Sequence, residues 1–239
     1  MTEHGPERRT YVLIHGSWHG GWCWDRLAPI LGARAGRVLA PTLVGLGDLA
    51  SLATPATGLS THLDQLEAFL AKQDVRDAVL VGHSYAGMLL TGIAERVPQR
   101  LASLVYLDAL IPADGQSCFD LMPGVEVEFQ AGADAVGDGW LVPPLDAADL
   151  GVTDPSDASW VNGHLTPMPI MTHRERLAVP RHRARALRRS FVLCRRFGFH
   201  AFAAQARADG FDVVTEIDAG HDVQVTHPRE LSEILLALP

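Results

Sequence analysis

Cysteine is scarce in this chain and lysine is almost missing. The 239 residues contain three cysteines, Cys23, Cys118 and Cys194, which are widely spaced and form no Cys-x-x-Cys pair. This pattern argues against both a disulfide framework and a zinc knuckle. A reducing compartment is the simplest environment for such a chain, so we expect a cytoplasmic protein.

Long apolar runs are also absent. No apolar stretch approaches the roughly 20 residues that a membrane span needs, and residues 1–10 lack the apolar core of a secretory signal. The formal net charge of −8 gives no overall field that would attract nucleic acid. We therefore expect a soluble protein with no membrane or nucleic-acid partner, and the length and 47% apolar content suffice for one large buried core.

The positive charge is unevenly distributed along the chain. Lys72 is the single lysine, whereas nine arginines fall between Arg174 and Arg196. This cluster predicts either a solvated connector and helix face or a docking patch for an acidic partner or anionic substrate.

Short apolar runs alternate with segments of helical periodicity. Such alternation predicts an α/β fold with a mostly parallel, doubly wound sheet. The predicted helices cover residues 22–31, 85–97, a segment from a capping box at Thr61 and Asp64, and a last segment that begins near Pro228. The predicted strands cover residues 10–14, 37–40, 77–81, 101–107, 191–194 and 211–217, and residues 45–58 form a loop.

The alternation stops between about residues 109 and 180. Prolines cluster there, aromatic residues occur singly, and no strand is evident. A stretch of this length between two strands of one sheet is typical of an insertion. We therefore expect a single domain, 1–239, with an inserted helical cap at about 109–180.

The segment 79–88 predicts a catalytic nucleophile. An apolar strand leads into Gly82-His83-Ser84-Tyr85-Ala86 and then directly into a helix. This is the context of a nucleophile elbow, where a tight turn exposes a serine hydroxyl at the positive end of a helix. Ala86 stands where a glycine is usual, and a buried structural serine is the alternative interpretation.

A serine nucleophile needs a base, and the chain offers eleven histidines. His221 follows the last predicted strand, at the edge of the sheet where the serine is expected, and its order after the nucleophile fits this architecture. We predict that it is the base, although it could instead cap its loop. His227 is expected to begin the last helix.

The third member of a triad is a buried carboxylate that orients the base. The strand at 191–194 leads into a segment without any carboxylate, whereas the strand at 101–107 leads into Asp108. We therefore predict Asp108, which could also cap a turn or line the pocket as a neutral acid.

An oxyanion hole needs two backbone amides. The expected donors are Tyr85, directly after the nucleophile, and Ser17 in the glycine-rich loop after the first strand, with the Ser17 hydroxyl pointing into the pocket. A phosphate-binding loop is disfavoured because neither Gly-x-Gly-x-x-Gly nor Gly-Lys-Ser/Thr occurs. No metal or organic cofactor is expected.

Taken together, these segments resemble the α/β-hydrolase superfamily, and within it the bacterial esterases related to plant methylesterases and hydroxynitrile lyases. The resemblance extends over nearly the whole chain. It implies an eight-stranded type of sheet, a helical cap, and hydrolysis of small esters through an acyl-enzyme. The matching segments are residues 13–22, 41–47, 82–85, 104–109, 139–140 and 220–222.

Two residues depart from that resemblance. The related enzymes usually carry the acid after the penultimate strand, where this chain has Phe197, so Asp108 would be a relocated acid; failing that, a Ser–His dyad remains. The similar lyases place a lysine after the catalytic histidine, where this chain has Asp222, whose negative charge would repel cyanide.

The sequence thus predicts a serine esterase that cleaves a small, partly apolar ester. Two other functions stay open: a lyase or other non-hydrolytic enzyme that uses the His221 base, and a non-catalytic ligand-binding protein. The candidates to line the pocket, each of which could equally be part of the cap core, are Trp18, Met122, Trp140 and Trp160.

Overall fold

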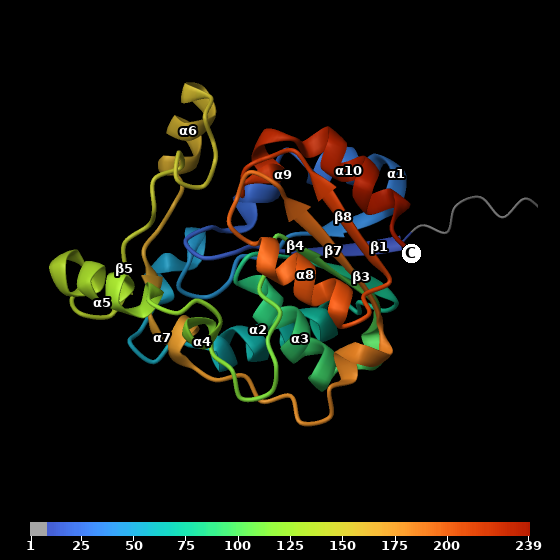
Figure 1. The fold of residues 1–239 in the computed structure, drawn as a ribbon, viewed down its shortest axis with the longest axis horizontal. Coiled ribbons are helices and arrows are strands. Elements are labelled where there is room, and N and C mark those ends of the chain that lie inside the picture. Colours follow the sequence, from blue (N-terminus) through green and yellow to red (C-terminus); the bar gives the residue numbers. More distant parts are fainter. Residues whose placement is uncertain (1–8) are drawn as a thin grey trace, which may run out of the picture.

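A six-stranded parallel sheet forms the centre of the computed structural model, which describes residues 9–239 (Figure 1). The strand order is β2-β1-β3-β4-β7-β8, and every neighbouring pair is parallel. The strands are β1 (Arg9–Ile14), β2 (Gly36–Leu39), β3 (Ala78–His83), β4 (Leu101–Leu107), β7 (Arg188–Cys194) and β8 (Val213–Ile217). The α/β fold with a parallel sheet is confirmed, whereas the described residues form six strands in this sheet and not eight.

Helices cover both faces of the sheet, which explains why β3 is buried along its entire length. One face carries α1 (Ala28–Ala35) and α10 (Pro228–Ala237), whose Leu31, Leu231 and Leu235 are fully buried. The other face carries α2 (Leu59–Lys72), α3 (Ala86–Arg96) and α8 (His200–Ala208). Because both faces are covered, the strands read as continuous apolar runs in the sequence.

Most of the chain between β4 and β7 lies beyond the carboxyl ends of the strands, and its last part, which includes Arg183, returns past Glu95 of α3 to the start of β7 (Figure 1). It contains α4 (Cys118–Leu121), α5 (Val125–Val136), β5 (Leu141–Val142), α6 (Pro155–Asn162), β6 (Met168–Pro169) and α7 (Met171–Arg174). We call residues 109–180 the cap. That the chain is a single domain with the cap as an insertion remains a prediction. The β5–β6 pair could not be predicted from the sequence because each strand is two residues long and one contains Pro169.

Most element boundaries differ from the prediction by one to three residues, and three segments differ in kind or starting point. The helix expected at 22–31 is a 3₁₀ helix (Gly21–Trp24) followed by α1, which begins just before Pro29. Helix α2 begins at Leu59, so that Thr61 is its third residue and accepts a hydrogen bond from the Gly58 amide (3.2 Å). The loop at 45–58 contains a second 3₁₀ helix (Gly47–Leu52). At the other end of the chain, His227 does precede α10, as predicted.

Candidate functional site

Ser84 occupies the sharp turn between β3 and α3. Its φ of +58° lies in the left-handed region, which a non-glycine residue adopts only where the surroundings enforce it. The Ser84 carbonyl accepts hydrogen bonds from the amides of Gly87 (3.1 Å) and Leu110 (3.1 Å), and the Ser84 amide donates to Leu107 (3.2 Å). These contacts hold the strained turn between two strands and a helix.

The chain approaches Ser84 so closely that two neighbouring positions require glycine. A Cβ at Gly16 would lie 2.8 Å from the Cβ of Ser84, and a Cβ at Gly87 would collide with the Leu110 carbonyl. The alanine at position 86, by contrast, fits as a buried residue. The requirement for a glycine therefore falls on position 87, one residue after the usual one.

His221 and Asp108 form a buried hydrogen-bonded pair. The distance from His221 Nδ1 to Asp108 Oδ2 is 2.6 Å, although the two residues are 113 positions apart in the sequence. Asp108 is completely buried and His221 is 4% exposed. Because the carboxylate can only accept, Nδ1 of His221 carries the proton.

Asp108 is rigidly held at the carboxyl end of β4. It has a φ of +42°, its amide donates to Val192 (2.7 Å), and its Oδ1 accepts the Cys194 amide (3.1 Å). Val192 and Cys194 belong to β7, the strand paired with β4. A carboxylate that follows either β4 or β7 therefore lies at the same edge of the sheet.

Aromatic rings fix the orientation of the His221 imidazole. Phe197, at the position where the resemblance implies a carboxylate, stacks on it with ring centroids 4.0 Å apart and an interplanar angle of 19°. Phe199 meets it edge-on at 5.3 Å, and His83 lies 4.3 Å away. Nε2 of His83 donates to the His221 carbonyl (3.0 Å), which fixes the backbone of the same residue.

Ser84 and His221 line one cavity of about 250 Å³. Within residues 9–239 the two side chains share this cavity without a direct hydrogen bond. Contacts of this kind are often long before substrate binds.

The amides expected to form an oxyanion hole belong to Ser17 and Tyr85, both of which line this cavity. Neither N–H donates to a backbone acceptor in the part of the chain that the structure describes. Tyr85 directly precedes α3, so its amide is one of the free donors at a helix start.

The Ser17 hydroxyl belongs to a chain of buried hydrogen bonds. It lies 3.1 Å from Nε2 of His173, whose Nδ1 lies 2.8 Å from the Thr172 hydroxyl, which in turn donates to the Pro169 carbonyl (2.7 Å). Burial lowers the pKa of His173 to about 3, so its ring is neutral. Since the Thr172 proton is already used, Nδ1 of His173 donates to Thr172 and the Ser17 hydroxyl donates to Nε2.

Apolar side chains dominate the cavity wall. Trp18 and Met122 line it as predicted, whereas Trp140 and Trp160 are not among its lining residues. The ring of Trp160 packs instead against Trp22 and under the guanidinium of Arg26. The remaining lining residues are Leu110, Val125, Glu128, Phe129, Leu145, Leu150, His173, Phe197 and Phe199.

Most of the lining residues that sequence reasoning missed come from the cap or follow a strand. Phe129 lies in α5, where Val125, Phe129 and Ala133 recur at helical spacing, so the sequence did carry a signal for this side of the helix. His173 lies in α7, which at four residues is too short to show any periodicity. Phe197 carried a different signal, because it replaces the expected carboxylate.

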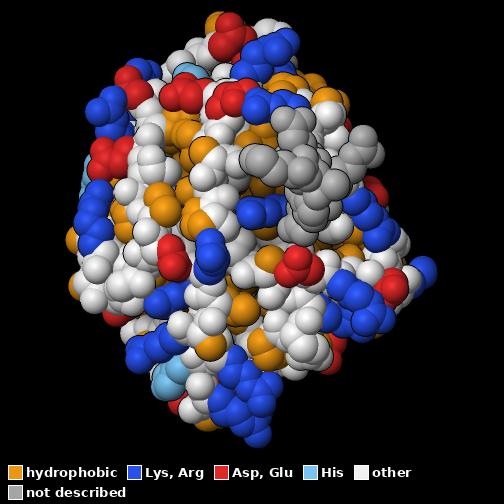
Figure 2. All heavy atoms as spheres, turned by 90° about the vertical axis from the view of Figure 1, so that its right-hand side faces the viewer, with side chains coloured by type: hydrophobic (Ala, Val, Ile, Leu, Met, Phe, Trp, Pro, Cys, Tyr) orange, Lys and Arg blue, Asp and Glu red, His pale blue; other side chains and the backbone are white. Residues whose placement is uncertain are grey.

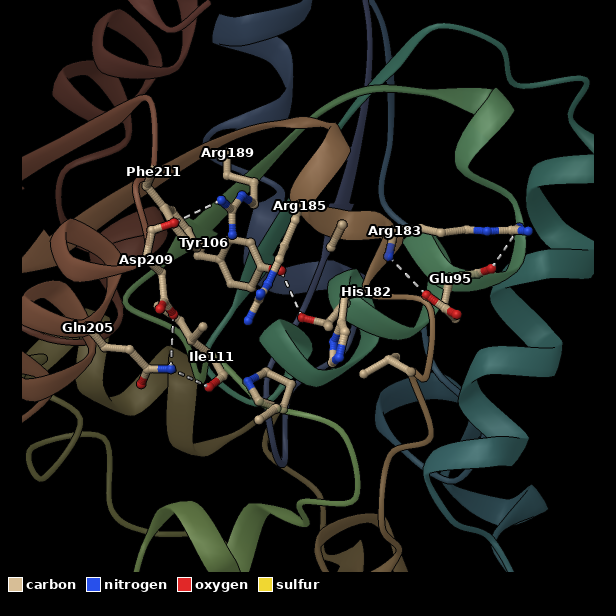
Figure 3. A pocket seen from close by; sticks show the side chains of 15 residues that line it. Glu95, Tyr106, Ile111, His182, Arg183, Arg185, Arg189, Gln205, Asp209 and Phe211 are labelled. Carbon is tan, nitrogen blue, oxygen red and sulfur yellow. Dashed lines mark hydrogen bonds between the residues drawn. The ribbon is translucent and has the colours of Figure 1, made fainter.

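The arginines between Arg174 and Arg196 are largely engaged within the chain. Six of the nine bind acidic side chains or backbone carbonyls; they are Arg174, Arg176, Arg183, Arg189, Arg195 and Arg196. Two of these bonds, from Arg183 and Arg189, border a second cavity of about 60 Å³ (Figure 3). On the face drawn in Figure 2, basic side chains alternate with acidic and neutral ones. These contacts favour the solvated interpretation, and an acidic partner stays a prediction.

His15 and His19 have a His-x-x-x-His spacing that could suggest a metal site. Their ring nitrogens, however, bind groups of the protein: those of His15 lie at the Gly16 carbonyl and the Leu43 amide, and those of His19 at the Ser17 carbonyl and Asp222. Residues 9–239 contain no group of three or more histidine, cysteine or acidic side chains arranged to hold a metal. None of the helices described here is long and apolar enough to cross a membrane.

The relatives found by comparison with known proteins include one that spans nearly the full length of the chain. The carbendazim hydrolyzing esterase of Nocardioides sp. (strain SG-4G) is 35% identical over 241 aligned residues, covering 95% of this chain and 98% of that protein. Salicylic acid-binding protein 2 of Nicotiana tabacum is 36% identical over 107 residues, 44% of this chain and 41% of its own length.

Solved structures share the fold. An extracellular alpha/beta-hydrolase from a Paenibacillus species superimposes with a TM-score of 0.84 at 24% identity, over 96% of this chain and 98% of that one. Tomato methylketone synthase I gives a TM-score of 0.82 at 20% identity, over 96% and 97% of the two chains. Cellular location stays a prediction. The model of the alpha/beta hydrolase family matches residues 11–234, and the chain belongs to that family.

Proposed function

We propose that this protein is a serine hydrolase that cleaves small, partly apolar carboxylic esters through an acyl-enzyme. The observation that carries the proposal is the buried Asp108–His221 hydrogen bond of 2.6 Å at the wall of the cavity that also contains Ser84. The full-length relative named as an esterase supports the same reaction class.

Each residue of the site has a distinct role in this reaction. Asp108 holds the proton on Nδ1 of His221, which leaves Nε2 free to take the proton of the Ser84 hydroxyl as Oγ attacks the ester carbonyl. The amides of Ser17 and Tyr85 donate to the oxyanion that forms. The intermediate collapses as His221 returns the proton to the departing alcohol, and water then releases the acid from Ser84 by the same two proton transfers.

The cavity restricts the substrate to small esters. About 250 Å³ with mostly apolar walls accommodates a short acyl group or a single ring system. Trp18 and Phe129, whose rings meet edge-on at 5.5 Å, offer an aromatic wall. Short p-nitrophenyl esters are therefore suitable test substrates, together with carbendazim because of the Nocardioides relative.

Covalent labelling tests the proposal directly. We expect a fluorophosphonate probe to label Ser84, and a short activated ester to leave an acyl group on it that mass spectrometry detects. Ser84→Ala should abolish both signals and lower hydrolysis by several orders of magnitude, whereas Ser51→Ala, at an exposed serine, should change neither.

The variant also separates the competing functions. Ester turnover that survives Ser84→Ala would overturn the proposal and favour a reaction that depends on the His221 base alone. Tight ligand binding with no turnover of any ester would indicate a binding protein.

A further inference from the structure

A second histidine–carboxylate pair lies directly behind His221. Nε2 of His19 is 3.0 Å from Oδ2 of Asp222, and their side chains are 2% and 0% exposed. Asp222 follows His221 in the chain, whereas His19 belongs to the loop after β1 that also carries Ser17. The pair therefore joins the loop of the base to the loop of the proposed oxyanion hole.

The hydrogen bonds of His19 fix its charge. Its Nδ1 lies 2.7 Å from the Ser17 carbonyl and its Nε2 faces the Asp222 carboxylate, and neither partner can donate a proton. Both ring nitrogens must therefore carry protons, which makes His19 an imidazolium. The attraction of Asp222 outweighs burial and raises the pKa of His19, while His19 contributes to holding the pKa of Asp222 at about 2.

The other buried titratable side chains around His221, apart from Asp108, are neutral. Burial holds the pKa of His83 well below its usual value and raises that of the Cys194 thiol, so both side chains are neutral. From the cap, His173 is neutral and the exposed Glu128 lies in the wall of the same cavity. At the surface of the strand ends, Arg195 and Arg196 both form ion pairs with Asp218.

Removing His19 would leave two buried carboxylates beside one imidazole. A nearby carboxylate favours the protonated form of a histidine by about one to three pH units. A protonated His221 cannot accept the Ser84 proton, so an uncompensated Asp222 would suppress the base near neutral pH.

We propose that His19 is a charge-compensating positioning residue: it neutralises Asp222, so that Asp108 is the one carboxylate whose charge acts on His221, and it fixes the Ser17 carbonyl. This inference rests on the proposed function, in which His221 is the base. It predicts an asymmetry between the two members of the pair, which a purely structural role would not produce.

The pH dependence of kcat/KM for a short p-nitrophenyl ester tests this asymmetry, because its acid limb reports the base of the free enzyme. In His19→Gln we expect the acid limb to move to higher pH by about one unit or more. In Asp222→Asn it should stay within about 0.3 units of the wild type, because no charge is left to compensate, and the double variant should return to the wild-type position. His182→Gln, at an exposed histidine lining the second cavity (Figure 3), is the matched control.

A direct readout separates this inference from the proposed function. The NMR titration of the His221 ring in a Ser84→Ala background should show the same pattern of midpoints without any turnover. If the His221 midpoint shifts in His19→Gln while the protein with Ser84 intact hydrolyses no ester, the proposed function is refuted and the inference is supported. Equal behaviour of His19→Gln and Asp222→Asn, or an acid limb that moves to lower pH in Asp222→Asn, would overturn the inference.

Discussion

Single residues decide the chemistry of the site, and Asp108 is the clearest case. Its carboxylate accepts two hydrogen bonds, from His221 (2.6 Å) and from the Cys194 amide (3.1 Å). Its orientation is therefore fixed both by β7 and by the loop after β8. Two other aspartates near His221 are engaged elsewhere: Asp218 pairs with arginines at the surface and Asp222 with His19. The geometry thus leaves Asp108 as the carboxylate able to set the tautomer of His221.

Asp108→Asn should keep the fold and lower kcat by roughly 10³- to 10⁴-fold, because an amide at this position can donate to Nδ1 and stabilise the wrong tautomer. Steady-state kinetics on a short p-nitrophenyl ester, with circular dichroism to verify the fold, checks this prediction. Asp218 is a half-exposed aspartate three residues before His221, and Asp218→Asn should keep the wild-type rate. A similar loss in both variants would refute the assignment of Asp108.

The elements β3 and α3 set the position of Ser84 through their close approach. Gly87, in the first turn of α3, packs directly against the Leu110 carbonyl, and the Leu110 amide binds the Ser84 carbonyl at 3.1 Å. A side chain at position 87 would therefore push the start of the cap away from the elbow. The turn depends on this contact as much as on the residues of the Gly-x-Ser-x-Ala pattern.

Gly87→Ala should lower the free energy of unfolding by about 2 kcal/mol or more, as expected for an overpacked backbone contact. Gly32→Ala, in α1, meets Val38 at an ordinary contact distance of 3.5 Å and should instead stabilise the protein by about 0.5–1 kcal/mol. Urea denaturation measures both changes. Equal effects of the two substitutions would show that the Leu110 contact does not constrain the elbow.

The folded chain buries several neutral histidines. Burial lowers the pKa of His15 and His173 to about 3 and that of His62 to about 4, and it holds the pKa of His83 well below its usual value. The unfolded chain protonates these residues near pH 6.5, so it binds more protons than the folded chain in acid. Their contribution to stability is complete above pH 6.5 and is lost as the pH falls toward 3–4.

Urea titrations at pH 7.5 and 4.5 should therefore show the free energy of unfolding fall by on the order of 5 kcal/mol at the lower pH. His19, whose pKa is raised, acts in the opposite sense and offsets part of the loss. His62→Gln should reduce the difference between the two pH values by about 2 kcal/mol. A stability that is flat or rises between pH 7.5 and 4.5 would contradict the neutral state of these histidines.

Local patterns in the sequence carried much of the fold and part of the site. β4 was predicted with its observed bounds, and the strand-to-helix context of Ser84 is the observed one, because both depend on neighbouring residues. The pocket lining was predicted less well: Trp140 and Trp160 lie outside it, and His173 and Phe129 were missed. The helical spacing of Val125, Phe129 and Ala133 was the signal available for Phe129, whereas the four-residue helix that carries His173 is too short to show one.

The order of apolar runs, turns and glycines by itself determined a parallel α/β sheet and a serine at a strained turn, since these follow from spacing along the chain. Only the tertiary structure decided which carboxylate binds His221, which side chain forms an ion pair with Asp222, and which cap side chains enclose the cavity. Asp108 and His221 are 113 positions apart, and His19 and Asp222 are 203 apart. Contacts over such separations depend on strand order and on the packing of loops at one edge of the sheet, neither of which is encoded in any local segment.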